Sequence, residues 1–469
     1  MQTLYKYSET NAAWDGRDHD RTTCHPNTRV NVLDDLSQWA ERPNSARVLW
    51  LCGSVGVGKT TVARTLAAKY AAQGRLAATF FFSSRNTQRA HRIIPTLVYQ
   101  LSISIPQLRR RIYQVYNEDP SIMEKGFDAQ IRALIAEPLG SLPMSIHFPN
   151  IVIIDGLDES RGLPVVDEIL HGINSMVSTA TFDAPSLRFL ITSRESPYIR
   201  DVLSSPEFRR IMQDKLLGNS KFEDDEDIKT YIESGFDAIR RKHQHTLRDV
   251  AQPWPGEDVI DQLVSNASGQ FIYASTVLRF IDDQNGRPEE LLDTILGTHT
   301  LPFNHPQAFS QLDELYHHIL QNTPSHVHGL LLNVLGGLVA ISCSLPVSDF
   351  EFILGLKPGD ANRALKQLHS LVRISEDNPS QSGGRQDPES NPPVLEILHK
   401  SFIDFLTDKD RAGIFFVNPS RRLASVVLFQ WKRTHGPFYY CTKNDMCVFS
   451  FLWDLMLTCT SVWTFTWFQ

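Results

Sequence analysis

The feature that most constrains the fold of this chain is a glycine-rich loop placed between a predicted strand and a predicted helix. Gly53 to Thr60 reads Gly-Ser-Val-Gly-Val-Gly-Lys-Thr and directly follows the apolar run Val48 to Cys52. The next segment, Thr61 to Gln73, has the pattern of a helix. A buried strand that passes through such a loop into a helix is typical of α/β folds in which the loop binds phosphate.

The residue types in this loop suit phosphate binding. Glycines let the backbone turn its N–H groups toward an anion, Lys59 brings positive charge to the β- and γ-phosphates, and the Thr60 hydroxyl is a ligand for Mg²⁺. A chance match to a glycine-rich turn is the alternative, which the flanking strand and helix disfavour. The predicted nucleotide contacts are Gly53, Ser54, Gly56, Val57, Gly58, Lys59, Thr60 and Thr61.

The composition is that of a globular chain of about three domains. Of its 469 residues 42% are hydrophobic, and the net charge of −7 with a pI near 6.1 argues against nucleic acid as the main partner. The six cysteines show no C-x₂-C pair, so neither a zinc site nor a disulfide framework is indicated. A reducing cytoplasm is the expected location.

The two ends of the chain differ in composition. Met1 to Asp20 is polar and lacks the apolar segment of a secretory signal. Val448 to Phe468 is apolar and aromatic, but it contains Asp454 and several hydroxyl side chains, and no basic cluster flanks it closely. The sequence therefore predicts no membrane partner, with this tail as a weak exception.

Alternating strand and helix patterns follow the loop. The strand-like runs are apolar and β-rich: Ala77–Ser83, Asn150–Asp155 and Leu187–Ser193. The helical stretches have apolar residues three and four positions apart: Ile93–Ile103, Gln107–Tyr116, Asp128–Leu139 and Val165–Val177. This alternation predicts a doubly wound parallel sheet with helices on both faces, over residues 45–217.

Helical patterns dominate from Asp224 onward. Five helices are predicted first: Ile228–His243, Asp258–Asn266, Gln270–Asp282, Pro288–Leu296 and Phe309–Gln321. Three helices and two short β-like runs follow: His326–Ile341, Ser348–Leu354, Ala361–Ser370, Leu371–Ser375 and Val394–His399. Between those two runs lies a polar insert, Asp377–Pro393, which should be mobile. The predicted domains are a lead-in segment (1–44), a P-loop NTPase domain (45–217), an all-α helical domain (218–323), a winged-helix domain (324–412) and a tail (413–469).

A cluster of acids follows the strand near residue 150. Ile151 to Glu159 reads Ile-Val-Ile-Ile-Asp-Gly-Leu-Asp-Glu, which brings carboxylates to the edge where open α/β sheets bind ligands. Asp155 is placed to hold Mg²⁺, and Asp158 or Glu159 could orient and deprotonate an attacking water. The alternative for Asp158 and Glu159 is a helix N-cap and first turn.

Another buried strand ends in Thr192-Ser193-Arg194 at the same edge. A guanidinium there could reach the γ-phosphate, detect its presence and neutralise charge during its transfer. The alternative for Arg194 is a salt bridge to Glu195 or another nearby acid.

With these motifs the chain resembles the NACHT-family NTPases of the STAND class, and more narrowly the fungal NACHT proteins with a nephrocystin-type nucleotide-binding domain. The resemblance covers about residues 20 to 415. Its most specific sign is the spacing of Asp155, Gly156 and Asp158, because family members follow the Mg²⁺-binding acid with a small residue and then an acid three positions on. Three further segments resemble family motifs, namely Cys24–Arg29, Phe80–Ser83 and Ala267–Ala274.

One more motif resembles the end of the family's winged-helix domain, where related switches use a histidine to contact the β-phosphate of ADP. It runs from Leu398 to Leu406, and His399 is the matching position. Lys400 departs from the acid found in many relatives, and Phe271 stands where animal and plant relatives often have a proline near the nucleotide. The residues alone favour a structural histidine, whereas the resemblance implies a nucleotide contact.

The resemblance implies a slow NTPase that acts as a switch. ADP would clamp the winged-helix domain onto the nucleotide domain, and exchange for ATP would release it so that protomers self-associate. A ligand shifts such an equilibrium only by its different affinities for the two states, so Arg194 and His399 would contact different phosphates. ATP is favoured over GTP because the chain has no Asn-Lys-x-Asp signature. The implied role is self/non-self recognition or programmed cell death.

Two other functions stay open. A conventional P-loop kinase needs an acceptor pocket and an arginine-rich lid, and no such lid stands out between Ser83 and Asn150. A non-catalytic nucleotide-binding scaffold would bind ADP or ATP without releasing phosphate. The family's effector domain and repeat array are not visible, so a truncated chain or a misread gene end after about Asn418 is a further expectation.

Overall fold

The computed structural model describes most of the chain. The described residues are 2–16, 22–82, 91–143, 148–160, 163–178, 187–218, 221–250, 252–284, 286–298, 310–341, 345–374, 393–422, 424 and 426. They fall into two compact units that divide between Leu315 and Tyr316, within one helix. Each unit is described below by itself.

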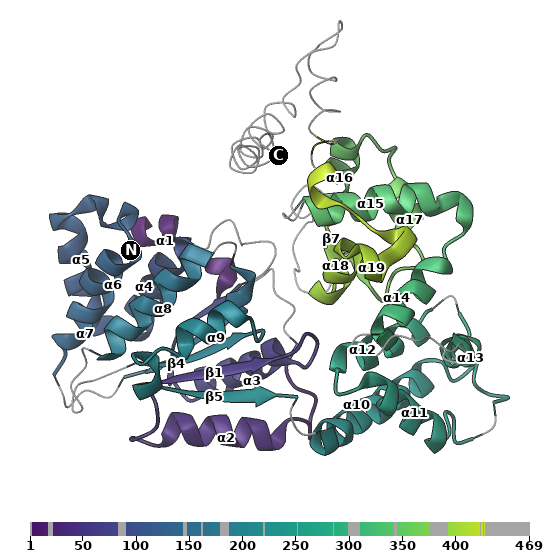
Figure 1. Cartoon of the computed structure of the whole chain (residues 1–469), viewed down its shortest axis with the longest axis horizontal. Helices are drawn as coiled ribbons and strands as arrows, with labels where there is room; N and C mark the ends of the chain where they lie inside the picture. Colours follow the sequence, from purple (N-terminus) through teal and green to yellow (C-terminus); the bar gives the residue numbers. More distant parts are fainter. Residues whose placement is uncertain are drawn as a thin grey trace, which may run out of the picture. The chain divides into compact units, whose positions relative to one another are not determined.

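The first unit is built around a five-stranded parallel sheet (Figure 1). Its strands are β1 (Val48–Gly53), β2 (Leu76–Phe81), β3 (Ile151–Asp155), β4 (Arg188–Ser193) and β5 (Met212–Leu217). Their order across the sheet is β2-β3-β4-β1-β5, and every neighbouring pair is parallel. The predicted α/β class is confirmed.

The strand order determines which strands have neighbouring carboxyl ends. Strand β4 lies between β1 and β3, with Cys52 opposite Ser193 and Ile154 opposite Ile191. Because parallel strands end at the same edge, the loop after β1 and the acids after β3 flank the residues that end β4.

The two faces of the sheet are covered by different helices (Figure 1). Leu49, Leu51 and Ile153 share one core with helices α2 (Val30–Glu41) and α3 (Lys59–Ala72). The alternate residues of the same strands point into a second core, which is formed with several helical segments, among them four of the helices between β2 and β4. These are α4 (Ile93–Ser104), α5 (Arg109–Glu118), α6 (Phe127–Ile131) and α8 (Leu163–Ser178). Burial on both faces explains the continuous apolar runs of the strands.

The structure differs from the sequence prediction in several places of this unit; helix α2, for example, lies in the lead-in segment, for which the sequence predicts no helix. Strand β5 was not predicted, because its sequence Met-Gln-Asp-Lys-Leu-Leu is mostly polar and the strand lies at the edge of the sheet. The helix predicted over Asp128–Leu139 is interrupted by a π-helical turn at Arg132–Ala136, between α6 and α7 (Glu137–Gly140).

The predicted helices after the sheet are present. They are α10 (Lys221–Lys242), α11 (Glu257–Ala267), α12 (Phe271–Ile281), α13 (Pro288–Thr298) and α14 (Ser310–Gln321). Helices α10, α11 and α12 pack against one another. The remaining short helices of this unit are α1 (Gln2–Tyr7) and α9 (Pro197–Leu203).

The second unit contains a small antiparallel ribbon after three helices. The helices are α15 (His328–Ala340), α16 (Val347–Leu354) and α17 (Asp360–Leu365), and the ribbon strands are β6 (Val372–Ile374) and β7 (Leu395–Ile397). Helices α18 (Lys400–Thr407) and α19 (Lys409–Ala412) follow. This is the element order on which the winged-helix prediction rests, and the domain assignment itself stays a prediction.

Several predictions concern residues outside the described part of the chain. The insert up to residue 392 and the apolar tail Val448–Phe468 belong to them. Among the helices of the described residues, none has the length and apolar character needed to cross a bilayer. Of the cysteines, Cys24 and Cys52 are free thiols.

Candidate functional site

The glycine-rich loop leaves β1 and enters α3 with glycines where the backbone needs them. Gly56 and Gly58 have φ values of 79° and 96°, a region that side-chain-bearing residues rarely adopt. Gly58 is the N-cap of α3, so the loop ends at the positive end of that helix. At Gly53 a Cβ would lie 2.6 Å from the carbonyl oxygen of Leu217, so only glycine fits beside β5.

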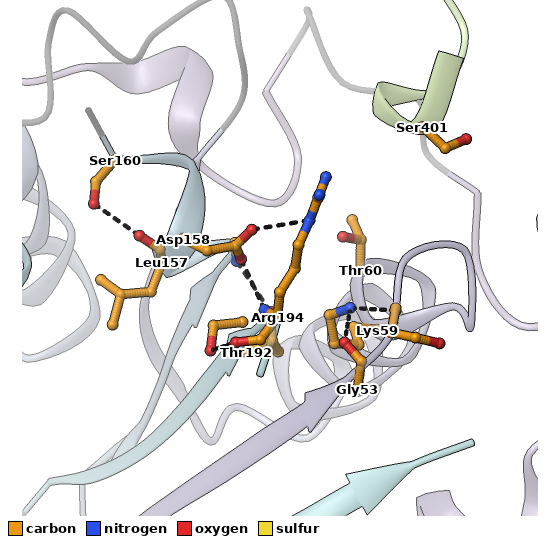
Figure 2. Close-up of polar contacts among 12 residues, drawn as sticks. Gly53, Lys59, Thr60, Leu157, Asp158, Ser160, Thr192, Arg194 and Ser401 are labelled. Carbon is orange, nitrogen blue, oxygen red and sulfur yellow. Dashed lines mark hydrogen bonds and ion pairs between the residues drawn. The ribbon is translucent and has the colours of Figure 1, made fainter. Parts of the chain in front are cut away.

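Lys59 folds back over the loop in this structure. Its Nζ donates to the carbonyl oxygens of Gly53 at 2.9 Å and Ser54 at 2.8 Å (Figure 2). Burial lowers the pKa of Lys59, and the carboxylates of Asp158 and Asp155 oppose that shift. The ammonium is therefore held at the loop by dipoles that an anion can replace.

Asp155 is the most buried acid of the site. It is 2% exposed, and its two oxygens accept hydrogen bonds from hydroxyls, Oδ2 from Thr60 Oγ1 at 2.8 Å and Oδ1 from Thr192 Oγ1 at 2.6 Å. Burial raises the pKa of Asp155, while the bonds from Thr192 and Thr60 work in the opposite direction. The two predicted Mg²⁺ ligands, Thr60 and Asp155, are thus brought into direct contact although they lie on different elements.

Asp158 and Arg194 form a pair in the same cluster (Figure 2). The Arg194 backbone N–H donates to Asp158 Oδ1 at 3.0 Å, and Arg194 Nε lies 3.2 Å from Oδ2. The side chains are 30% and 13% exposed, respectively. The predicted salt-bridge alternative for Arg194 therefore exists, with Asp158 as its partner, while Glu195 pairs with Arg200. The pair also fixes the direction in which the guanidinium leaves β4.

Glu159 lies beside this pair in a short 3₁₀ turn, Leu157–Glu159, and not in the first turn of a long helix. The turn starts from Gly156, whose φ of 72° reverses the chain after β3. The amide of Glu159 donates to the carbonyl oxygen of Gly156 at 2.7 Å. The acids after β3 are thus held in a tight turn at the edge of the sheet.

His399 belongs to the second unit, where it caps helix α18. Its Nδ1 accepts a hydrogen bond from the Ser401 amide at 3.1 Å and lies 2.6 Å from Ser401 Oγ, which is 2.6 Å from the Tyr316 hydroxyl. Since an amide N–H can only donate, the neutral imidazole carries its proton on Nε2. The structure thus shows a local structural role for His399, and its predicted phosphate contact stays a prediction.

Two residues of the site were not predicted. Thr192 holds the start of the acid turn, because its hydroxyl donates to Asp155 and accepts from the Gly156 amide at 3.0 Å. Arg29 donates from Nη2 to the carbonyl oxygen of Val57 at 3.0 Å. The available signals were the position of Thr192 at the end of a strand and the presence of Arg29 in the lead-in motif.

The residues present fit a Mg²⁺–nucleotide complex. Hydroxyl and carboxylate oxygens, as on Thr60 and Asp155, are the ligands that Mg²⁺ takes in phosphate sites, usually with oxygens from the phosphates themselves. The loop adds backbone amides at a helix N-terminus and the ammonium of Lys59. Asp155 is buried and bonded to two neutral hydroxyls, with Arg64 and Lys59 as nearby cations, so a bound Mg²⁺ would add to the compensation of its charge.

One protein family matches the part of the sequence that contains the candidate site. Residues 28–194 match the family described as Nephrocystin 3, N-terminal. The match includes the glycine-rich loop, the acid turn and Arg194, and it ends before helix α10. No curated protein matches the sequence significantly.

Solved structures give more distant likenesses. A signal transduction ATPase with numerous domains (STAND) with a tetratricopeptide repeat sensor, from Pyrococcus horikoshii, is 12% identical with a TM-score of 0.42, over 90% of this chain and 48% of that one. The ADP form of the Aeropyrum pernix ORC2 protein is 14% identical with a TM-score of 0.32, over 84% and 97%. AMPPCP-bound DnaA from Aquifex aeolicus is 12% identical with a TM-score of 0.30, over 77% and 91%. This chain thus spans about half of the STAND protein, and at these TM-scores the likenesses do not bear on function.

Proposed function

We propose that this chain is a nucleotide-dependent switch of the NACHT/STAND type that binds Mg²⁺ with ATP or ADP and hydrolyses ATP slowly. The observation that carries the proposal is the 2.8 Å contact between Thr60 and Asp155, which joins the phosphate loop to the acid turn across the sheet. The Nephrocystin 3 match over the same residues supports it.

In this proposal each group of the site has one task. The loop amides and Lys59 bind the β- and γ-phosphates, and Thr60 and Asp155 hold Mg²⁺, which neutralises phosphate charge when bound. Arg194, held by Asp158, is directed toward the terminal phosphate. Glu159, next to Asp158 in the same turn, orients the attacking water.

Slow turnover follows from the state of Asp158. Both of its oxygens are bonded to Arg194, so it is not placed as a general base in this structure. In this proposal the ion pair rearranges before hydrolysis, and such a conformational step limits the turnover of the switch. We propose that ATP is the preferred nucleotide, since the guanine signature is missing from the sequence.

The switching step is proposed from the resemblance to NACHT proteins. ADP favours a closed state in which His399 donates from Nε2 to a phosphate, and ATP favours an open state that self-associates. The tautomer is the one that such a bond needs. A role in self/non-self recognition or programmed cell death belongs to the same proposal.

The test is nucleotide identity in purified protein, compared for the native chain and Lys59→Ala. We expect the native chain to retain ADP and the variant to lose it, with affinity reduced at least about 100-fold, because the ammonium makes charge-assisted bonds to phosphate. Lys69→Ala is the matched control, since Lys69 lies on the same helix and donates to Ser37.

Three outcomes would contradict parts of the proposal. Equal retention by the native chain and Lys59→Ala rejects the assigned pocket. Bound nucleotide without any phosphate release, even after self-association, indicates a scaffold. Sustained transfer to a small acceptor, with no nucleotide-dependent change in mass, indicates a kinase.

A further inference from the structure

Arg29 is a buried arginine outside the predicted site, and it contacts three separate parts of the first unit. It is 5% exposed and lies just before helix α2, with a left-handed φ of 58°. A side-chain-bearing residue rarely adopts that φ, so the surrounding contacts must stabilise it. The position of Arg29 is therefore tightly specified by the fold.

The first contact of Arg29 is with the phosphate loop. Its Nη2 donates to the carbonyl oxygen of Val57 at 3.0 Å. Val57 lies between Gly56 and Gly58, the two loop residues with positive φ. A hydrogen bond that holds this carbonyl also holds the peptide group that joins Val57 to Gly58, and so helps to set the direction of the loop amides.

The other contacts of Arg29 are with the helices that follow the sheet. Its Nη1 forms an ion pair with Asp224 of α10, and its backbone amide donates to Asp227 Oδ2 at 3.0 Å. The guanidinium carbon lies 4.9 Å from the ring centre of Phe271, the first residue of α12. The side chains of Arg29 and Asp224 are 5% and 4% exposed, so the pair is shielded from solvent.

Helix α12 also touches the loop directly. The Ile272 amide donates to the carbonyl oxygen of Gly56 at 3.2 Å. A Cβ on Gly56 would lie 2.2 Å from Ile272 Cγ2, so the absence of a side chain allows this approach. Two consecutive loop carbonyls, on Gly56 and Val57, are thus bonded to α12 and to Arg29.

We propose that Arg29 is a positioning residue for the phosphate loop, and that it couples the loop to helices α10 and α12 so that nucleotide binding and the packing of these helices stabilise each other. This deepens the proposed function and rests on it for the identity of the ligand. The loop amides bind phosphate only in one backbone arrangement. Arg29 and Ile272 stabilise that arrangement by bonding to the carbonyl oxygens of Val57 and Gly56. By linkage, a nucleotide that favours the same arrangement strengthens the contacts to Asp224 and Phe271.

The coupling has a chemical requirement that lysine does not meet. Arg29 uses Nη1 for Asp224 and Nη2 for Val57, and its planar guanidinium faces the Phe271 ring. An ammonium keeps the charge but presents its donors from one nitrogen and has no planar face, so it cannot bond the Asp224 and Val57 oxygens in the guanidinium's geometry and also contact the face of the Phe271 ring. Arg29→Lys therefore separates the geometry of the group from its charge.

The experiment measures two properties of Arg29→Lys, Asp224→Asn and the double variant. Affinity for a fluorescent ADP analogue with Mg²⁺ should fall about tenfold in each single variant, and little further in the double variant, because the two residues act as one unit. In the nucleotide-free variants, amide hydrogen exchange should be faster than in the native chain both at Gly56–Lys59 and at the start of α12.

Arg75→Lys is the matched control. Arg75 also combines an ion pair, a bond to a backbone carbonyl and a ring contact, in this case with Glu41, Ala40 and Tyr70. We expect this variant to leave nucleotide affinity within twofold of the native value. If Arg29→Lys does not fold, Phe271→Leu keeps an apolar side chain, removes the ring face, and should weaken binding about threefold.

The outcomes separate this inference from the proposed function. Native affinity in Arg29→Lys, or full additivity in the double variant, overturns the inference while leaving the nucleotide site intact. If the native chain binds no nucleotide, the proposed function fails. The exchange measurement still tests the link between the loop and α12 in that case, and unchanged exchange in Arg29→Lys would reject it.

Discussion

The end of strand β3 and the turn that follows it each carry an aspartate, and the fold places the two in different surroundings. Asp155 is 2% exposed and accepts hydrogen bonds from two neutral hydroxyls, of Thr60 and Thr192. Asp158, three residues later, is more exposed and bonds to the guanidinium and the amide of Arg194. The first carboxylate is therefore bonded to neutral groups, whereas the second is charge-paired.

This difference indicates different tasks for two acids that look equivalent in the sequence. A buried carboxylate that bonds to a phosphate-loop hydroxyl is where a metal ion gains most from binding. A carboxylate already bonded to arginine gives up that pairing before it can act as a base, which fits the proposal that Asp158 holds Arg194. Substitutions at Asp155, Asp158 and Thr192 test this division.

The largest effect is expected for Asp155→Asn. Mg²⁺-dependent ATP hydrolysis should fall at least about 100-fold, since an amide has the shape of the carboxylate but not its charge. Single-turnover assays with protein in excess over ATP measure this rate. Asp119→Asn is the control, because Asp119 is also bonded to a hydroxyl and a cation, Ser121 and Lys125, at a distance in sequence from the site. A residual rate near the native one would refute the metal role of Asp155.

A smaller effect is expected for the charge pair. Asp158→Asn and Arg194→Lys should each slow hydrolysis about tenfold, because either change misplaces the guanidinium, and the double variant should be no slower than the worse single one. The same single-turnover assay applies. Multiplied effects in the double variant would instead mean that Asp158 acts independently, as the general base considered from the sequence.

Although Asp155→Asn should slow hydrolysis, it should stabilise the nucleotide-free protein. Burial raises the pKa of Asp155, so between its ordinary value and the raised one the folded state binds more protons than the unfolded state, and stability falls as pH increases through that window. Asp155→Asn removes this penalty. We expect the free energy of unfolding of Asp155→Asn to exceed the native value by about 1 kcal/mol at pH 7. The difference should vanish at about pH 4.

Urea unfolding at several pH values measures this difference. The comparison needs equal m-values, which show that the variant changes the folded state and not the extent of unfolding. A variant that is less stable than the native chain at pH 7 would show that the hydrogen bonds from Thr60 and Thr192 outweigh the cost of burying the charge.

The smallest effect on hydrolysis is expected for Thr192, whose hydroxyl bonds to Asp155 and to the Gly156 amide. Thr192→Val should slow hydrolysis about threefold and lower stability by about 1 kcal/mol, because the Gly156 amide loses its acceptor and Asp155 loses a donor. Thr192→Ser keeps the hydroxyl and should restore both properties. Failure of serine to restore the rate would point to packing of the threonine methyl group and not to the hydrogen bonds.

The sequence alone determined the α/β class, the phosphate loop and the position of most helices and strands. Gly56 and Gly58 are required by backbone conformation, and apolar runs such as Ile151–Ile154 follow from burial on both faces of the sheet. These are local constraints, so they are visible in a single stretch of chain. The edge strand β5 was missed because its mostly polar sequence carries no such signal.

The pairing of the candidate residues depends on the three-dimensional fold and is not visible in the sequence. The strand order places β4 between β1 and β3, which brings Thr192 to Asp155 and Arg194 to Asp158. The same applies to Arg29, whose partners lie in the loop and in two helices roughly 200 to 240 residues further along the chain. Hydrogen bonds and ion pairs act over a few ångströms in space, and a sequence gives the distance along the chain but not the distance across the fold.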